Sequence, residues 1–504
     1  MKNNVFQEKV EIRNSILENC INYISPSWAL RREIARLSID NVRSYNAASS
    51  AKRLENWNAT GASANSEIIP ALLKLIYRSR ELMRNEPLAV RLVNSVVGHT
   101  VGTGIRPNSN GNSKRAEMLD VLWEGENENG WCKYADFDEL TTVYGLMALA
   151  FRTVFESGSC FLKKERINRN SYIPLSIRVL EPDFLDITKD QVLLGGGRIK
   201  KGIEFDKNGH RVAYWLWDSH PGESFFYDTR RLKSIRIPTS EIKHVFWRTR
   251  PGQDYGVPWT YVIATLLHEL GDFVDAHLVR QKIAACYTAF ERDMEATESE
   301  KMSDKLDKLI PGRIEKLPPG KTVEFSDPPI LDNAEVYERC RKQEIAAGGG
   351  TTYENLTCDY QYATFSNSRM AQQEMNISGV DQWQNFLVIP LICETIWDWF
   401  EEACDVAMLI PSGDNVGASW TVPGRPFIQP VDETEATKNQ VRIGAKLPSQ
   451  MVRELSGDPN RHWKKYAEEF KKLDSLGISL DCDPRKNIKT GQPTNLAAGD
   501  NKNA

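Results

Sequence analysis

The sequence predicts a large α+β protein with two long helices and a section of mostly antiparallel sheet. Apolar residues recur every three to four positions over 259–294 and 369–410, which is the spacing of an amphipathic helix. Short β-prone runs, separated by Gly, Asn and Pro turns, occupy 159–247. We therefore expect helical sections on either side of an antiparallel sheet.

The composition is that of a folded chain. Its 504 residues predict two to four domains at roughly 150 residues each. Apolar residues make up 41% and charged residues 26%. Lys and Arg number 64 and Asp and Glu 68, so the net charge is −4, which excludes a globally basic nucleic-acid coat but leaves local basic patches open. We expect no membrane span, because no apolar run reaches about 18 residues, and no secretory signal in residues 1–24.

Neither the cysteines nor the histidines predict a metal site. The nine cysteines are an odd number without a C-x-x-C pair, which predicts reduced thiols in a cytoplasmic fold. The seven histidines show no ligand spacing. His268-Glu269 opens a zinc-protease pattern, but Asp272 stands where the second histidine is required.

The first half of the chain divides into an arm, helices and strands. Residues 1–59 predict a polar arm with local positive charge. Residues 68–101 predict two helices that break at Pro87 and end in a glycine-rich turn, and 115–156 predict further helix. Asn208-Gly209 predicts a β-hairpin. The predicted strands are 160–162, 176–180, 199–205, 212–217 and 244–247.

The second half is built around the two long helices. The first is followed by a small insertion with a charged helix at 296–308, and Pro390 is expected to kink the second. The other expected segments are a helix at 334–347, a polar, aromatic loop at 351–368, a linker at 411–430, a charged helical pair at 433–447 and 458–476, and a polar disordered tail at 481–504.

Gly348-Gly349-Gly350 ends the 334–347 helix abruptly. Three glycines in a row cost about 2 to 3 kcal/mol of extra backbone entropy. A mobile or close-packed loop would justify that cost, and a simple helix cap is the alternative. The sequence leaves both interpretations open.

No motif completes a catalytic site. Pro318-Pro319-Gly320-Lys321-Thr322 matches the end of a phosphate loop, but Glu315 stands in place of the first glycine, so we interpret it as a turn. Gly102-Thr103-Gly104 lacks the third glycine of a dinucleotide site and is typical of a turn that ends a helix. Composition and spacing thus indicate a structural or assembly protein.

An ordered series of short motifs resembles the lambda-type phage portal proteins. It spans roughly residues 40–480, and its specificity comes from the order. The motifs are Tyr45-Asn46-Ala47-Ala48, Trp57, the run 78–87, the run 101–107, Leu180-Glu181-Pro182-Asp183, the run 202–206, Ala213-Tyr214-Trp215, His220-Pro221-Gly222, His244-Val245-Phe246, Arg250-Pro251-Gly252-Gln253, the run 276–286, Leu309-Ile310-Pro311-Gly312, Pro318-Pro319-Gly320, Ile345-Ala346-Ala347-Gly348, the run 353–357 and the run 365–369. Departures from the family pattern are Tyr255 for a usual Arg, Gly349 to Thr352 for Leu-Gly-Val-Pro, Cys358 for a usual Gly and Thr364-Phe365 for Asn-Tyr.

The resemblance implies a ring of identical subunits, usually twelve, at one vertex of a bacteriophage capsid. The ring surrounds a channel through which double-stranded DNA is packaged and ejected. Its implied partners are the terminase large subunit, the major capsid and scaffolding proteins and the head-completion or connector proteins. The resemblance implies a virion protein assembled in the bacterial cytoplasm, with no enzyme activity, cofactor, metal or membrane.

The order of elements maps the portal domains onto this chain. The implied map is an arm at 1–59, a wing at 60–258, stem helices at 259–292 and 334–347, a clip at 293–333, a channel loop at 348–368, a long helix at 369–410 and, after the linker at 411–430, a crown at 431–480. The expected DNA-facing residues are Gly348, Gly349, Gly350, Tyr353, Glu354, Asp359, Tyr360, Phe365, Ser366, Asn367 and Arg369. The expected terminase-docking residues are Arg313, Glu315, Lys316, Lys321 and Glu324.

Two other classes of protein remain open as alternatives. One is a different capsid or connector protein. The other is a nucleotide-dependent DNA-packaging enzyme subunit, which would need a complete phosphate loop or a carboxylate cluster for metal.

Overall fold

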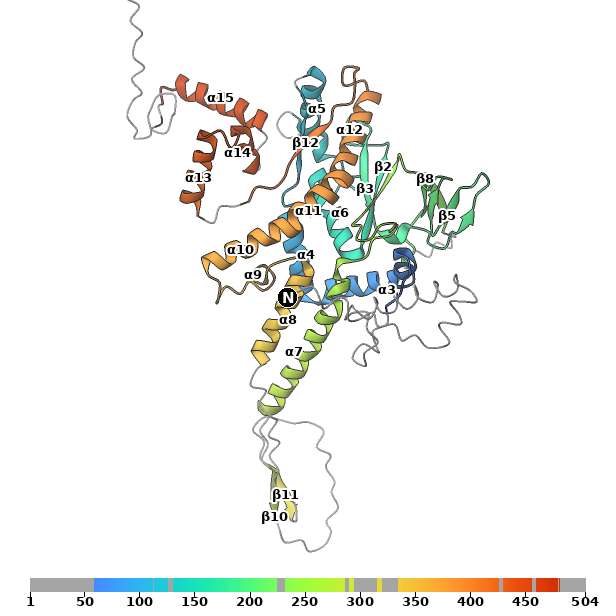
Figure 1. The fold of residues 1–504 in the computed structure, drawn as a ribbon, viewed down its shortest axis with the longest axis vertical. Helices are drawn as coiled ribbons and strands as arrows, with labels where there is room; N and C mark the ends of the chain where they lie inside the picture. Colours follow the sequence, from blue (N-terminus) through green and yellow to red (C-terminus); the bar gives the residue numbers. More distant parts are fainter. Residues whose placement is uncertain are drawn as a thin grey trace, which may run out of the picture. The chain divides into compact units, whose positions relative to one another are not determined.

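The computed structural model describes residues 59–111, 113–125, 130–223, 232–285, 290–293, 315–319, 334–425, 429–455, 459–478 and 480. The chain divides into two units, Met1–Ser63 and Ala64–Ala504. All helices and strands below belong to the second unit (Figure 1). The predicted arm at 1–59 and the predicted tail at 481–504 lie outside the described residues, apart from Ala59.

Two helices open the second unit, as the sequence predicts. Helix α3 spans Ala64–Asn85 and α4 spans Pro87–Thr100. Pro87 is the first residue of α4, where its missing N–H costs no helical hydrogen bond. Gly102 and Gly104 then take positive φ angles and turn the chain into β1, Arg106–Ser109.

The predicted helix at 115–156 is wrong as one continuous element. Helix α5 spans Lys114–Glu124, a 3-10 turn spans Trp131–Lys133, and α6 spans Val143–Ser157. The Thr142 side chain accepts a hydrogen bond from the Gly145 N–H and begins α6 anew. Gly158, at φ 85°, ends α6 in the left-handed conformation.

Two antiparallel sheets confirm the predicted β-rich section. The first has the order β3-β2-β9, formed by Ser176–Leu180, Ser159–Glu165 and Ile242–Phe246, and α6 packs against it. The second has the order β4-β5-β6-β7-β8, formed by Gln191–Val192, Arg198–Lys200, Ile203–Phe205, Arg211–Trp217 and Ser234–Pro238. Gly209, at φ 88°, lies in the predicted hairpin between β6 and β7.

The expected linker at 411–430 contains a strand instead. Strand β12, Ala418–Thr421, pairs antiparallel with β1, and Asn108 lies opposite Ser419. The run Ala418-Ser-Trp-Thr combines a β-branched and an aromatic residue, which suit a half-buried strand. The pairing ties the start of the unit to a segment about three hundred residues later.

The first long helix is shorter than predicted. A 3-10 turn spans Trp259–Val262, α7 spans Ala264–Ala285, and Phe290–Asp293 forms strand β10. Strand β10 pairs in parallel with β11, Glu315–Pro319, so Pro318 and Pro319 belong to a strand and not to the predicted turn. A Pro fits there because β11 pairs on one side only. The predicted helix at 296–308 lies outside the described residues.

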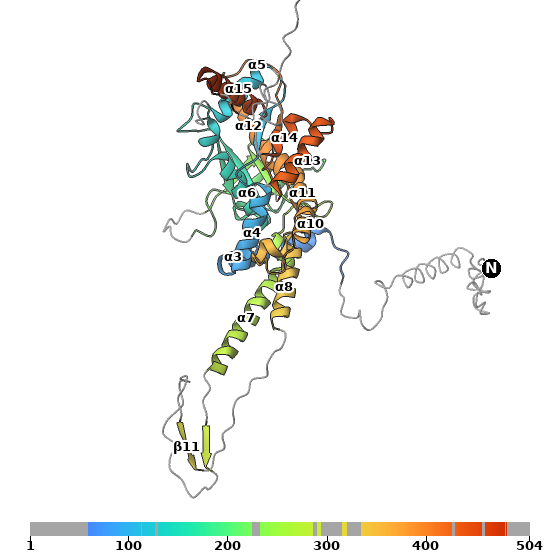
Figure 2. The same ribbon diagram turned by 90° about the vertical axis from the view of Figure 1, so that its left-hand side faces the viewer.

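Helix α8, Ala334–Gly349, returns alongside α7 (Figures 1 and 2). The Phe273 ring of α7 lies 4.8 Å from the Tyr337 ring of α8. The predicted second helix of the pair is thus confirmed, with its end two residues later than expected.

The second long helix runs from Phe365 to Val406 in five segments. Three α-helical segments, α10 (Phe365–Met375), α11 (Asp381–Trp383) and α12 (Glu394–Val406), alternate with two π-helical segments, Asn376–Val380 and Gln384–Cys393. Pro390 lies inside the second π-helical segment. Proline has no N–H to donate, so it interrupts the regular α-helical hydrogen bonds. The wider hydrogen-bonded turns of a π-helical segment accommodate this interruption.

The sequence predicts two helices after residue 430, but the structure has three. Helices α13 (Pro430–Arg442), α14 (Pro448–Glu454) and α15 (Pro459–Ser475) follow one another. Leu447 and Pro448 begin a short helix that the charge pattern did not reveal.

The main core joins α5, the 3-10 turn Trp131–Lys133 and α12 through aromatic rings in tilted and edge-to-face contact. Trp123 lies 5.1 Å from Trp131, 5.4 Å from Trp397 and 5.0 Å from Phe400, measured between ring centroids. Beside them, the Arg115 guanidinium donates to Glu401 (2.8 Å) and Asp405 (2.6 Å). Arg115 and Glu401 are both buried, so this ion pair lies inside the body of the unit.

Candidate functional site: the glycine junction and the segment after it

The three glycines that end α8 each contact a different element. A Cβ atom on Gly348 would lie 2.6 Å from Ile263, on Gly349 2.7 Å from Leu92, and on Gly350 2.9 Å from Trp383. Real Cβ atoms essentially never approach this closely. We call these three glycines, with Ile263, Leu92 and Trp383, the glycine junction.

The glycine junction also caps α8. Gly350 has φ 73°, in the left-handed region that glycine adopts without cost. The Thr351 N–H donates to the Ala346 carbonyl (3.0 Å), which closes the end of the helix. The helix-cap interpretation is confirmed at Gly350, and the loop interpretation is wrong for Gly348 and Gly349, which lie inside α8 and permit close packing there.

The segment expected to be a loop contains a short helix. Helix α9 spans Tyr353–Thr357, and the Thr352 side chain caps it by accepting from the Asn355 N–H (3.1 Å). Leu356 is buried, and the Arg91 Nε of α4 donates to the Asn355 carbonyl (2.8 Å). These contacts attach the segment to α4.

Cys358 stands where the resembled family usually has glycine. It adopts φ 56°, the left-handed conformation at the end of α9. That conformation explains why glycine suits the position, and a cysteine there carries the steric cost of a Cβ atom.

A hydrogen-bonded carboxylate follows α9. The Gln361 N–H and the Tyr353 hydroxyl each donate to Asp359 at 3.0 Å. Both bonds lower the pKa of Asp359, with the Gln361 N–H the larger cause, so this carboxylate stays ionised at neutral pH.

The predicted DNA-facing residues differ in position and exposure. Gly348 and Gly349 lie inside α8, not in a loop, because the helix continues to Gly349; Gly348 is exposed and Gly349 is buried. Gly350, Tyr353, Glu354 and Asp359 are half-buried. After α9, the exposed members are Tyr360, Phe365, Ser366, Asn367 and Arg369.

Of the predicted docking residues, Glu315 and Lys316 lie in β11. Arg313, Lys321 and Glu324 lie outside the described residues.

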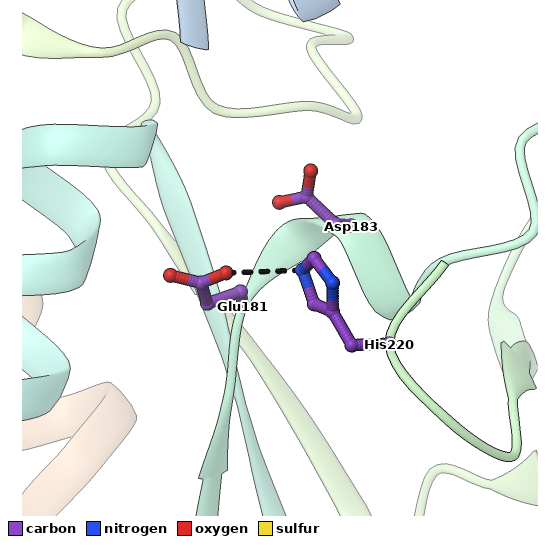
Figure 3. Close-up of side chains that lie close together, drawn as sticks. All are labelled: Glu181, Asp183 and His220. Atoms are coloured by element: carbon purple, nitrogen blue, oxygen red, sulfur yellow. Dashed lines mark ion pairs between the residues drawn. The ribbon is translucent and has the colours of Figure 1, made fainter. Parts of the chain in front are cut away.

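A cluster that sequence reasoning missed brings two carboxylates and a histidine together. Ligand atoms of Glu181, Asp183 and His220 lie within 4.8 Å of one another (Figure 3). Glu181 and Asp183 flank Pro182 after β3, and His220 follows β7, so the sheets join residues almost forty positions apart. All three belong to motifs of the family resemblance, which was the only sequence signal available.

The chemistry of this cluster is that of an ion pair. The Arg80 Nη2 of α3 donates to Asp183 (2.6 Å) and lies 3.4 Å from Glu181. Burial works to lower the pKa of Arg80, and the hydrogen bond and charge of Asp183 outweigh it, so the pKa is raised. Asp183 is thus already paired with a cation, which also lies close to Glu181.

The histidine is also unsuited to a metal ligand in this arrangement. Its Nδ1 accepts from the Gly222 N–H (3.0 Å), so in the neutral ring the proton is on Nε2. That Nε2 lies 3.2 Å from Glu181. A metal at Nε2 would displace the proton and the Gly222 hydrogen bond, so we interpret the cluster as a tie between α3 and the sheets.

Among the described residues, no helix has the length and apolar character needed to cross a membrane.

Comparison with known proteins identifies the class. The family model "Phage portal protein, lambda family" matches residues 50–384. The "Probable portal protein" of Halomonas phage phiHAP-1 is 25% identical over 325 residues, covering 60% of this chain and 61% of that protein. The "Portal protein" of Escherichia phage N15 is 22% identical, covering 70% and 73%, and "Portal protein B" of Escherichia phage lambda is 20% identical, covering 64% and 67%.

Two solved structures are also similar. One chain from the virion of a native gene transfer agent particle has a TM-score of 0.41 and 13% identity, covering 77% of this chain and 93% of that one. A chain from the neck of the empty particle, computed with C6 symmetry, has a TM-score of 0.42 and 15% identity, covering 75% and 93%.

The family model and the phage relatives define a structural component of phage capsids, a class distinct from enzymes. The family model covers well over half of the chain, so the chain belongs to the lambda family of phage portal proteins. It spans about three fifths of the Halomonas relative's length.

Proposed function

We propose that this chain is the portal subunit of a phage capsid, forming a ring, usually of twelve copies, through which double-stranded DNA is packaged and ejected. Membership of the lambda portal family is the observation that carries the proposal. The ring would stand at one capsid vertex of the virion and would assemble in the bacterial cytoplasm.

The α7–α8 pair supports self-assembly. On α7, Val274, Leu278 and Val279 are 42%, 46% and 54% exposed. On α8, Val336 is 60% exposed. Exposed large apolar side chains on two neighbouring helices are what a second subunit would cover in the ring.

The fold suggests portal domains with corrected bounds. The wing would be 60–258, the stem α7 and α8, the clip the segment 286–333 between them, the channel segment 351–364, the long helix 365–406 and the crown α13 to α15. The clip, with Arg313, Glu315, Lys316, Lys321 and Glu324, would dock the terminase large subunit. Major capsid, scaffolding and head-completion proteins would bind other surfaces of the ring.

The negative charge of the channel segment would let DNA slide through the channel without binding tightly to it. Twelve copies would repeat each charge twelve times around the bore. Many Lys or Arg contacts to phosphate would bind DNA tightly, whereas Glu354 and the ionised Asp359 repel it. The DNA-facing set would be the exposed residues Tyr360, Phe365, Ser366, Asn367 and Arg369 together with Tyr353, Glu354 and Asp359, with the three glycines positioning them.

Exchange of Glu354 for Lys tests this charge. Glu354→Lys should slow DNA packaging in a particle assembled with the variant ring, while Glu354→Gln should have little effect. Asp359 is less suitable, because it accepts the Tyr353 hydrogen bond. Packaging rates that do not change in Glu354→Lys particles would remove the support for a repelling bore.

The proposal as a whole is tested by negative-stain microscopy of the purified full-length chain. We expect rings with a central hole and no nucleotide hydrolysis. Monomers that hydrolyse ATP would support the packaging-enzyme alternative instead.

A further inference from the structure

A cavity of about 650 Å³ lies where the two sheets meet the second π-helical segment of the long helix. Arg211 of β7, Lys243 of β9 and Arg248 just after β9 line it, and none of the described lining residues carries a carboxylate. Aromatic rings complete the wall, among them Trp247 and the Phe386 ring of the π-helical segment. Phe386 is 67% exposed. The cavity is thus positively charged, aromatic and open on one side.

Two buried nitrogens in this wall have no hydrogen-bond partner among the described residues. The Arg211 Nη2 donates to Asp254 (2.8 Å), which leaves its Nε unpartnered. His244 is 7% exposed and its Nδ1 is unpartnered. Unsatisfied buried polar atoms are rare in native proteins, and each one calls for an explanation. Both nitrogens are shielded from solvent by the surrounding side chains, so they belong to the packed wall behind the cavity and not to its open surface.

The His244 ring is held firmly in this wall. It stacks on Phe161 at 4.4 Å and meets the edge of Tyr214 at 5.6 Å, measured between centroids. Burial, together with the charge of Arg211, lowers the pKa of His244 to about 3, so the ring is neutral at pH 7. It therefore adds no positive charge to the cavity.

The cations of the cavity have carboxylates close to them. Arg211 pairs with Asp254, and Lys243 lies in the field of Asp398, so Arg248 carries most of the remaining positive charge. Arg and Lys are the usual phosphate-binding residues, and flat aromatic rings stack on nucleic-acid bases of any sequence.

We propose that this cavity binds a nucleoside phosphate, with the phosphate at Arg211, Lys243 and Arg248 and the base against Phe386 and Trp247. The volume lies within the usual range of about 300 to 1,000 Å³ for small-ligand sites. The inference does not depend on the channel function, because the cavity is formed by strands and the π-helical segment of a single subunit.

Titration calorimetry on the full-length chain tests the proposal, with dAMP, deoxyadenosine and inorganic phosphate as probes. We expect dAMP to bind at least tenfold more tightly than either part alone. The double variant Lys243→Ala, Arg248→Ala should weaken dAMP binding at least tenfold, and Phe386→Ala at least fivefold, the lower end of what one stacked base contributes. Two matched controls, Lys207→Ala in the β6–β7 hairpin and Ile377→Ala in the first π-helical segment, should bind like the parent.

Further probes separate the sources of the ligand. A short 5′-phosphorylated single strand that binds more tightly than dAMP would assign the site to a strand end, and the reverse to a free nucleotide. The proposal is overturned by any of three results: no saturable dAMP binding, equal losses in the control variants, or tighter binding of a peptide with neighbouring Asp and Phe, which would indicate a protein segment. Circular dichroism confirms that each variant is folded.

Discussion

The glycine junction and the α7–α8 pair differ in how far one subunit completes its own packing. At the glycine junction, three positions without side chains let α8 approach three other elements to distances that no Cβ atom would permit. Along α7, Val274, Leu278 and Val279 remain about half exposed. The first region completes its packing within one chain, whereas the second is the surface that we propose a neighbouring subunit covers.

If the core of the second unit is completed within one chain, substitutions in that core should lower the free energy of unfolding of the single subunit. The largest effect is expected at Arg115, which pairs with the buried Glu401. Arg115→Ala leaves that carboxylate buried without its cation, and we expect a loss of about 3 to 5 kcal/mol in the free energy of unfolding. Denaturant unfolding measures it.

Arg166→Ala is the matched control. It removes an exposed arginine that lies 3.2 Å from Glu241, and such surface pairs contribute at most about 1 kcal/mol. Equal losses in the two variants would show that the buried ion pair has no special role.

A smaller loss is expected at the glycine junction. Gly349→Ala places a methyl group 2.7 Å from Leu92 in a filled core, which should cost about 1 to 3 kcal/mol. Gly98→Ala, inside α4, meets nothing within 4 Å and should stabilise the chain by about 0.5 to 1 kcal/mol. Thermal unfolding of both variants compares them, and a shift of the same sign for both would contradict the packing account.

The second sheet should weaken in acid. Glu204 accepts hydrogen bonds from Arg236 at 2.8 and 2.9 Å, and this pairing is the main cause of its lowered pKa. A carboxyl whose pKa is lower in the folded state stabilises the fold above its ordinary value, near 4.5, and loses this contribution as the pH falls through the folded value.

Removing the charge should therefore flatten the acid response. In Glu204→Gln, the free energy of unfolding should be lower at pH 7 and should fall less steeply between pH 5 and pH 3 than in the parent. Parallel curves for the two proteins would mean that Glu204 is not responsible.

The smallest effect on subunit stability is expected on the α7–α8 pair. Leu278→Glu with Val279→Glu changes two exposed side chains, so the unfolding free energy should move by no more than about 0.5 kcal/mol. Assembly should nevertheless fail, because two charges would be buried between neighbouring subunits. Sedimentation velocity measures the assembly state. Gln281→Glu, an exposed charge on the same helix, should still assemble, and normal assembly of the double variant would exclude this surface as an interface.

Local chemistry made part of the fold predictable from sequence. Pro87 separates α3 from α4, and Asn208-Gly209 forms the predicted hairpin, because in both cases a few neighbouring residues determine the backbone. The antiparallel sheets followed from the same turn signals. Helical periodicity likewise located α7 and the long helix.

Interactions between distant segments could not be read in this way. The pairing of β1 with β12 joins Asn108 to Ser419, and neither segment carries a strong β signal alone. The apolar spacing of the first long helix continued to 294, but the chain becomes a strand at Phe290, because pairing with β11 overrides the helical pattern. The π-helical segments change the period of the helix without changing its composition.

The position of the candidate site in the sequence was predictable, but its three-dimensional contacts were not. The triple glycine marked the end of α8, but its three separate packing partners come from α4, from Ile263 just before α7 and from α11. Glu181, Asp183 and His220 were visible only as family motifs, since the sheets bring them together.

The central claim is that the apolar α7–α8 surface closes identical subunits into a ring, and native mass spectrometry of the full-length chain tests it most directly. We expect one dominant species at a whole-number multiple of 57.3 kDa, near twelvefold, in the parent and only single chains in the Leu278→Glu, Val279→Glu variant. A parent protein that stays at 57.3 kDa at every concentration would contradict the account.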